Sequence, residues 1–194
     1  MIGAVLLAAG RSTRMGRPKQ ILPWGDTTIA GHIIRVLESA GVKEIVVVTG
    51  AAREAVEGAL VGTGVRLAHS PDFEVGELLS SIQTGLRALP EDCEAALIAL
   101  GDQPQIQPEV IRAVIEGYRE TRAPIVVPSY QMRRGHPVLV ARSLWPDLLS
   151  LSPPASLRDF LSAERPIHYV VVSTPTILGD MDTPEDYERL ISRP

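Results

Sequence analysis

The chain contains 194 residues, 45% of them hydrophobic, and its 19 Lys+Arg and 23 Asp+Glu give a formal net charge of −4. This length predicts one domain, residues 1–194, and the acidic balance excludes the basic surface of a general nucleic-acid-binding protein. With no apolar run near the ~18 residues of a membrane helix, no basic opening of a signal peptide and one cysteine, Cys93, we expect a cytoplasmic protein that binds small molecules, without membrane or nucleic-acid partners.

Short runs of apolar and β-branched residues alternate with helical patterns along the chain. Each run is apolar almost throughout, which predicts a strand covered by helices on both faces of a sheet. The alternation therefore indicates an α/β fold with a mostly parallel central sheet and helices on both of its faces. The expected strands are residues 2–7, 44–48, 65–68, 95–100, 125–127 and 169–172.

Helices are expected between these strands. Apolar residues at helical spacing predict one helix over 27–40, ended by Gly41 in a left-handed conformation, and another over 108–118. Ser80 or Ser81 is expected to cap a third helix that ends near residue 89. These caps fix where each helix begins or ends.

The alternation falters in residues 132–163. Two consecutive prolines, Pro153 and Pro154, interrupt this segment before a short helical stretch over 155–163. We expect residues 132–163 to form an insertion that leaves the main sheet.

The loop after the first strand carries the clearest sign of a ligand. Small residues that let a ligand approach the backbone precede four basic residues, Arg11, Arg14, Arg17 and Lys19. Such a loop suits a triphosphate, although its spacing matches neither a P-loop nor the glycine fingerprint of a dinucleotide-binding fold. A solvated basic turn that binds nothing is the alternative at this point.

Five motifs follow one another across nearly the whole chain. They are LAAGRSTRMGRPK at 7–19, SSIQTG at 80–85, GDQP at 101–104, RGHPV at 134–138 and DMDTPED at 180–186. In this combination the chain resembles the molybdenum cofactor cytidylyltransferases of the MobA-like NTP transferase family. The resemblance implies a Rossmann-like nucleotidyltransferase fold that joins a nucleoside monophosphate to a phosphate acceptor and releases pyrophosphate, with Mg²⁺ as cofactor.

Two acidic positions are candidates for holding the magnesium ion. Asp102 follows the expected strand 95–100, and ligands of open α/β sheets collect beyond the carboxyl ends of the strands. Extended backbone would turn Asp180 and Asp182 to the same side, and Thr183 can cap the following helix in place of Asp182. One or two carboxylates are enough for Mg²⁺ when phosphates complete its shell. By resemblance the ligands are Asp102 and Asp182, with Asp180 as the alternative to Asp182.

Further site residues follow from the needs of in-line phosphoryl transfer and from the resemblance. We expect Arg14, Lys19 and Asp102 to be catalytic, because transfer at phosphorus needs alignment and charge stabilisation. By resemblance Gly135 and His136 bind the acceptor, and the insertion 132–163 contributes to its pocket; a histidine without function is the alternative for His136. The expected nucleotide-binding residues are Leu7, Ala8, Ala9, Gly10, Arg14, Lys19, Ser80, Ser81 and Gly101.

The resemblance implies that CMP is transferred from CTP to a molybdopterin-type phosphomonoester. Ala9 favours CTP over GTP, because the guanylyl-transferring relatives have glycine at this position. Residues 150–158 depart from the glycine- and acid-containing segment of the family, which leaves the acceptor less well defined than the nucleotide. The alternatives are a guanylyl- or sugar-phosphate nucleotidyltransferase and a non-catalytic carrier of a nucleotide or pterin. A molybdoenzyme or a maturation protein is the expected protein partner.

Overall fold

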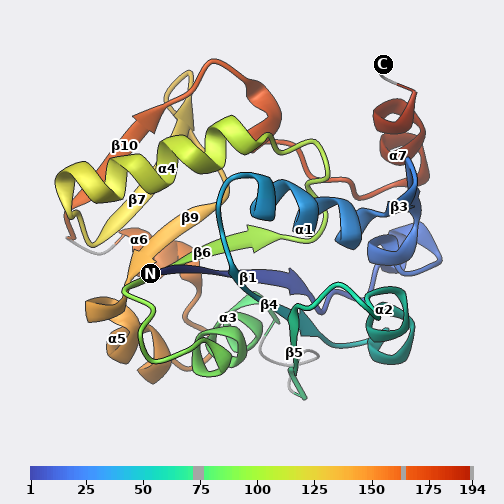
Figure 1. Ribbon diagram of the computed structural model, residues 1–194, viewed down its shortest axis with the longest axis horizontal. Helices are drawn as coiled ribbons and strands as arrows, with labels where there is room; N and C mark the ends of the chain where they lie inside the picture. Colours follow the sequence, from blue (N-terminus) through green and yellow to red (C-terminus); the bar gives the residue numbers. More distant parts are fainter. Residues whose placement is uncertain (72–76, 163–164, 193–194) are drawn as a thin grey trace.

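A computed structural model describes residues 1–71, 77–162 and 165–192 of the chain. Among these residues, eight strands form one twisted central sheet (Figure 1). In spatial order the strands are β10 (Ile167–Val171), β7 (Ile125–Tyr130), β9 (Val138–Ala141), β6 (Ala95–Leu100), β1 (Ile2–Ala8), β4 (Glu44–Thr49) and β5 (Arg66–His69), with β8 (Arg133–Arg134) paired to the end of β7. A separate hairpin joins β2 (Pro23–Trp24) to β3 (Thr27–Thr28).

Most of the sheet is parallel, as the alternation of apolar runs and helical patterns predicts. The strands β5, β4, β1 and β6 pair in parallel, and so do β7 and β10. The carboxyl ends of β1, β4 and β6 therefore meet at one edge of the sheet, where Leu7 is in register with Val48 and Leu100. This edge is where an open α/β sheet binds its ligands.

Helices cover both faces of the sheet, which confirms the predicted layers (Figure 1). On one face, apolar side chains of α1 (Ile29–Ser39) and α4 (Pro108–Thr121) pack together, joined at the edge by α2 (Arg53–Ala59). On the other face the apolar layer comes from α3 (Glu77–Ala88), α5 (Trp145–Ser150) and α6 (Leu157–Ser162). None of the described helices is long and apolar enough to cross a bilayer.

The helix ends follow the capping chemistry of the sequence. The Thr28 hydroxyl accepts a hydrogen bond from the Gly31 amide at the start of α1, and Gly41 follows its end with φ of 92°. The last helix, α7 (Pro184–Ile191), begins with the predicted capping box, in which Thr183 and Asp186 bind each other's backbone amides. Tyr187 of this helix donates to the carbonyl of Pro23 at 2.8 Å, which ties α7 to the β2–β3 hairpin.

Short 3-10 helices form in the loops between these elements. Two of them follow β1 in the basic loop, and the others precede α5 and α7. Their bounds are η1 (Thr13–Met15), η2 (Lys19–Ile21), η3 (Arg142–Leu144) and η4 (Pro175–Ile177).

Two expectations about local structure are wrong. The helix α3 begins at Glu77, so Ser80 and Ser81 lie within its first turns instead of at its N-cap. Residues 138–141 do not leave the sheet, because they form β9, which pairs antiparallel with both β6 and β7. The short helix expected over 155–163 begins at Leu157, and residue 163 lies outside the described part of the chain.

Candidate active site

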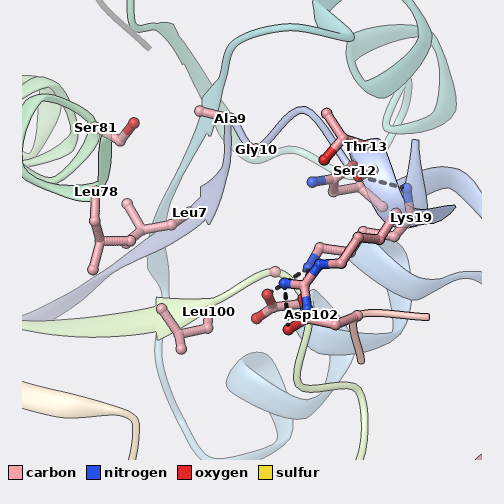
Figure 2. Close-up of a pocket in the computed structure, with 14 residues that line it drawn as sticks. Leu7, Ala9, Gly10, Ser12, Thr13, Lys19, Leu78, Ser81, Leu100 and Asp102 are labelled. Carbon is pink, nitrogen blue, oxygen red and sulfur yellow. Dashed lines mark hydrogen bonds and ion pairs between the residues drawn. The ribbon is translucent and has the colours of Figure 1, made fainter. Parts of the chain in front are cut away.

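A cavity of about 330 Å³ opens where β1 and β6 end, between the basic loop and the start of α3 (Figure 2). Leu7, Leu78 and Leu100 form an apolar wall at one end, close to Ser81 (Figure 2). The opposite end is polar and contains two basic and two acidic side chains. The remaining lining residues are Ala9, Gly10, Ser12, Thr13, Arg14, Lys19, Gln20, Gly101, Asp102 and Asp182.

Glycines let the neighbouring loops close around the end of β1. A Cβ atom on Gly101 would lie 2.5 Å from the carbonyl oxygen of Leu7, and one on Gly50 would lie 2.5 Å from that of Ala9. Any larger residue at these positions would push the loops after β4 and β6 away from β1. The two glycines therefore let the neighbouring loops pack closely against residues 7–10 and leave the backbone of these residues accessible at the floor of the cavity.

The basic loop turns back on itself and brings Lys19 into the cavity. Ser12 has a left-handed backbone with φ of 52°, and its hydroxyl accepts a hydrogen bond from the Lys19 amide at 3.1 Å. Met15 is buried at the base of the loop and holds η1 against the core. Lys19 is consequently only 8% exposed, although it belongs to a loop rich in arginine.

The Lys19 ammonium lies between two carboxylates that are far apart in the sequence. Its Nζ atom is 2.6 Å from Oδ2 of Asp102 and 3.2 Å from Oδ1 of Asp182, and it also donates to the Met181 carbonyl at 3.3 Å. The more exposed Arg14 reaches Oδ2 of Asp182 at 2.8 Å. The structure thus brings together the four charged residues that the motifs single out.

The segment containing Asp182 is fastened to the loop after β6. Met181 is fully buried, and its amide donates to the carbonyl of Asp102 at 2.9 Å. Gln103 donates to Oδ1 of Asp180 at 2.9 Å. Asp182 therefore lines the cavity, whereas Asp180 is held by Gln103 and is not among the lining residues.

The electrostatic setting of Asp102 combines two opposing effects. Burial raises the pKa of its carboxyl group, and the neighbouring Lys19 ammonium opposes that rise by favouring the charged form. The carboxylates of Asp180 and Asp182 add to the rise by repulsion. The net result is a pKa for the Asp102 carboxyl group above its usual range, with Lys19 limiting the rise.

The donor set at this end of the cavity fits magnesium. Asp102 and Asp182 both offer hard oxygen ligands to one cation, which in this structure is the ammonium of Lys19. Within the described residues no group of three or more His, Cys, Asp or Glu side chains could enclose a metal by itself. Two carboxylates that leave the remaining positions to phosphate and water are the arrangement that Mg²⁺ commonly takes.

Not every expected nucleotide contact faces the cavity. Leu7, Ala9, Gly10, Gly101 and Ser81 do. The Ala8 side chain is packed in the apolar layer on the opposite face, because successive residues of a strand point to opposite sides, so the contact expected of Ala8 is one of its backbone. The Ser80 hydroxyl lies 3.4 Å from that of Ser70, away from the lining. Residues 12, 13, 20, 78 and 100 also line the cavity but were not expected there.

The expected acceptor residues lie beside the cavity, outside its lining. The Nδ1 atom of His136 is 3.3 Å from the carbonyl oxygen of Ile98 in β6. Burial lowers the pKa of His136, and the Ile98 carbonyl together with the charges of Asp180 and Asp102 opposes that change. Gly135 is packed so closely against Ile177 that a Cβ atom would overlap its carbonyl oxygen. These contacts fix the backbone of residues 135–136 next to the polar end of the cavity.

Comparison with known proteins gives a consistent family. Residues 4–168 match the MobA-like NTP transferase domain. Molybdenum cofactor cytidylyltransferase of Escherichia coli (strain K12) is 29% identical over 189 residues, covering 96% of this chain and 93% of that protein. Nicotine blue oxidoreductase of Paenarthrobacter nicotinovorans is 30% identical over 199 residues, covering 98% of this chain and 96% of that protein.

A solved structure agrees over the same length. Rv0371c of Mycobacterium tuberculosis H37Rv superimposes with a TM-score of 0.86 at 30% identity, covering 99% of this chain and 98% of that one. The same protein has been solved in a complex with manganese, which superimposes with a TM-score of 0.82. The sequence match, the fold and the four charged residues at the cavity lead to one conclusion: the chain belongs to the MobA-like NTP transferase family.

Proposed function

We propose that the chain is a Mg²⁺-dependent nucleotidyltransferase that transfers CMP from CTP to a molybdopterin-type phosphomonoester and releases pyrophosphate. The observation that carries this proposal is the meeting of Lys19, Arg14, Asp102 and Asp182 at one end of a cavity on the carboxyl edge of the sheet. Two cationic side chains suit a triphosphate, and two carboxylates suit its metal ion. The family membership supports the same class of reaction.

The shape of the cavity supports one orientation of the nucleotide. The apolar wall of Leu7, Leu78 and Leu100, with Ser81 beside it, suits the base and ribose. The backbone of the small residues Ala9 and Gly10 then lies along the middle of the nucleotide. The polar end, with its basic side chains, receives the triphosphate. This orientation places the reacting α-phosphate near Asp102 and the start of the basic loop.

The reaction needs alignment and charge stabilisation from the protein. An oxygen of the acceptor phosphomonoester attacks the α-phosphorus, the bond from this phosphorus to the β-phosphate bridging oxygen breaks, and the electron pair leaves with pyrophosphate. Because a phosphomonoester has a second pKa near 6, the attacking group is already an anion at neutral pH and needs no protein base. Arg14 and Lys19 stabilise the negative charge that accumulates on the leaving pyrophosphate.

Magnesium completes this site. Asp102 and Asp182 would hold the ion, which when bound supplies Lewis-acid stabilisation of the phosphate oxygens. The residues of this chain keep both carboxylates in place through the contact of Met181 with Asp102. The relative in the same fold that has been solved with manganese supports the use of a divalent cation.

The choice of base and acceptor is the finer part of the proposal. Ala9 favours CTP over GTP, and the Escherichia coli relative at 29% identity is named as a cytidylyltransferase of the molybdenum cofactor. Gly135 and His136 are proposed to contact the acceptor, with help from residues 132–163. We place the reaction in the cytoplasm and expect a molybdoenzyme or a maturation protein to receive the product. Guanylyl and sugar-phosphate transfer are the alternatives within the same fold.

A second candidate is an oxidoreductase activity. It is favoured by one observation, the 30% identity to nicotine blue oxidoreductase along almost the full length of both chains. The glycine fingerprint of nicotinamide-binding folds is missing from the first loop, which weakens this candidate. Oxidation of NADH or NADPH by the purified protein with nicotine blue as the electron acceptor, followed by absorbance, tests it directly.

The test of the proposed function measures pyrophosphate release and the nucleotidylated product with molybdopterin and each of CTP, GTP, ATP and UTP, with and without Mg²⁺. We expect turnover that requires Mg²⁺ and is fastest with CTP. Lys19→Ala should lower turnover about a hundredfold, whereas Arg112→Ala, on the outer surface of α4, should leave it unchanged. A GTP maximum would indicate the guanylyl alternative. Nucleotide binding without any turnover, seen as a thermal shift, would indicate the carrier.

A further inference from the structure

The arrangement of charges around Lys19 affects how the site can bind a metal ion and a triphosphate. In the chain without ligands, the Lys19 ammonium contacts one oxygen of Asp102, one oxygen of Asp182 and the Met181 carbonyl. Lys19 is nearly buried, and its ammonium group has three N–H donors and three acceptors around it, so each donor has a hydrogen-bond partner. The ammonium therefore occupies the space between the two carboxylates that suit a divalent cation.

The two carboxylates that line the cavity are already paired with cations. Lys19 lies within 3.2 Å of both Asp102 and Asp182, and Arg14 contacts Asp182, so two positive charges face two negative charges. The nearby carboxylate of Asp180 is outside the lining, where it accepts a hydrogen bond from Gln103. A divalent cation that entered this group alone would have to displace Lys19 or sit beside it, and either arrangement leaves positive charges repelling one another. A triphosphate brings several negative charges and gives both basic side chains new partners.

We propose that Lys19 is an internal substitute for the metal ion, which blocks binding of a divalent cation until a triphosphate draws the lysine away from Asp102 and Asp182. This inference rests on the proposed function, because it concerns the same two carboxylates. It assigns Lys19 a second role besides stabilising pyrophosphate. The metal and the nucleotide then bind with positive coupling, and the metal alone binds weakly.

The experiment measures binding of Mn²⁺ alone to the purified full chain, without nucleotide, by the loss of the free Mn²⁺ signal in electron paramagnetic resonance. The variant Lys19→Met keeps the length of the side chain and removes its charge. The matched control is Arg17→Met, which removes one positive charge from the same loop at an exposed position outside the cavity lining. A double variant, Lys19→Met with Asp102→Asn, tests whether any added binding uses the expected carboxylates.

We expect Lys19→Met to bind Mn²⁺ at least ten times more tightly than the wild type, because two carboxylates lose their internal cation. The Mn²⁺ affinity of the control Arg17→Met should differ from that of the wild type by less than threefold, because this substitution removes only a charge that is distant from the carboxylates and screened by solvent. The double variant should lose the gain. Equal affinity of Lys19→Met and Arg17→Met, with both variants folded by circular dichroism, would overturn the proposal.

Lys19→Gln replaces Lys19→Met if the latter does not fold. A second measurement uses the wild type with a non-hydrolysable CTP analogue that has a methylene group between the α- and β-phosphates. The protein and the analogue together should bind Mn²⁺ at least tenfold more tightly than the protein alone or the analogue alone. Failure to do so would also overturn the proposal. The proposed function is judged separately by CMP transfer. Transfer that depends on Asp102, combined with unchanged Mn²⁺ binding in Lys19→Met, would reject only the role of Lys19 as a substitute cation.

Discussion

At the scale of single residues, two aspartates that are separated by one residue in the sequence have different surroundings. Asp182 meets Lys19 and Arg14 at the cavity. Asp180, two residues earlier, accepts a hydrogen bond from the buried Gln103 and does not line the cavity. The position of Met181, buried between them, fixes this division. The geometry therefore favours Asp182 over Asp180 as the second ligand of the proposed metal ion.

Substitution of each aspartate tests this choice. We expect Asp182→Asn to lower kcat/KM for CMP transfer about a hundredfold, the effect of losing one stabilising contact in the transition state. The matched variant Asp180→Asn should lower it less than about tenfold, since it keeps the contacts of Asp182. Steady-state kinetics over a range of Mg²⁺ concentrations measures both. A larger loss in Asp180→Asn than in Asp182→Asn would reverse the assignment.

Much of the candidate site can be predicted from the sequence, and the exceptions have a physical reason. Lys19 and Asp182 stand in motifs that carry the resemblance to the family, and Asp102 also follows an apolar run that predicts a strand of the sheet, so each can be selected from the sequence. Ala8 is expected to contact the nucleotide through its backbone, which the direction of its side chain does not test. Ser80 or Ser81 was expected there at the N-terminus of a helix, but α3 begins at Glu77, and of the two serines Ser81 lines the cavity. The direction of a side chain depends on the phase of its strand or helix, and a shift of one residue turns it away.

At the scale of secondary structure, two helices contain a glycine with opposite surroundings. A Cβ atom on Gly85 of α3 would overlap Cγ1 of Val5 and lie 3.0 Å from Cγ2 of Val48, because α3 packs directly on β1 and β4. In α2, a Cβ atom on Gly58 would have no neighbour within 4 Å. One glycine is needed for packing, and the other only lowers the stability of its helix.

The pair Gly85→Ala and Gly58→Ala tests this difference. We expect Gly85→Ala to lower the free energy of unfolding by about 1–3 kcal/mol through overpacking. Gly58→Ala should raise it by up to about 1 kcal/mol, because alanine favours the helix more than glycine does. Urea unfolding followed by circular dichroism measures both values. A similar change in the two variants would mean that contact with Val5 does not limit the size of residue 85.

The capping box of α7 gives the chain a dependence on pH. The hydroxyl and amide of Thr183 and the amide of Asp182 donate to the Asp186 carboxylate at 3.0–3.2 Å, and these hydrogen bonds, the Thr183 hydroxyl first, lower its pKa. The charged form is thus favoured in the folded chain. Its contribution to stability is present above the unfolded pKa near 3.8 and is lost as the pH falls through the lower folded pKa.

We therefore expect Asp186→Asn to lower the free energy of unfolding at pH 7 and to have a smaller effect at about pH 2, because the wild-type carboxyl group becomes neutral as the pH falls through its lowered folded pKa. Because Asp186 is partly exposed and screened by solvent, the effect at pH 7 should be modest. Urea titrations of both proteins at the two pH values measure it. An equal loss at both values would show that the negative charge of Asp186 has no part in the cap.

The order of strands and helices was largely predictable, and one strand was not. Six apolar runs predict strands that the structure contains. Four of these strands, β1, β4, β6 and β7, are buried almost along their whole length, and a strand covered on both faces must be apolar throughout, whereas the edge strands β5 and β10 are partly exposed. The four residues of β9 are also apolar, but they follow a polar hairpin and have no helix of their own before them. A pattern based on alternating strands and helices passes over such a segment.

At the scale of the whole molecule, Cys93 reports on complete unfolding. It is fully buried next to the start of β6, and burial raises the pKa of its thiol. Both effects suppress the reactive thiolate in the folded chain. We expect no reaction with a disulfide reagent at pH 8 within minutes, and one thiol per chain after addition of urea, measured by absorbance. Rapid reaction of the folded chain would show that the layer between α3 and the sheet opens locally.

The family and the layered α/β architecture follow from the sequence because they depend on features repeated along the chain. Five motifs in order and six apolar runs must all be altered before these conclusions change. The identity of the acceptor has no such redundancy. We expect it to depend on a few side chains near His136 and on residues 150–158, where the sequence departs from the segment that the family resemblance implies.

The position of β9 also has a consequence for the order in which the protein is made. Among the described residues, the pair β7 and β10 joins the rest of the sheet through β9, which binds β6 on one side and β7 on the other. On the ribosome, β6 and β7 emerge before β9, so each has an unpaired edge until residue 141 is free of the exit tunnel. The four-residue strand β9 then joins β7 to the half-sheet of β5, β4, β1 and β6, and β10 adds to the free edge of β7 only after residue 171 has emerged.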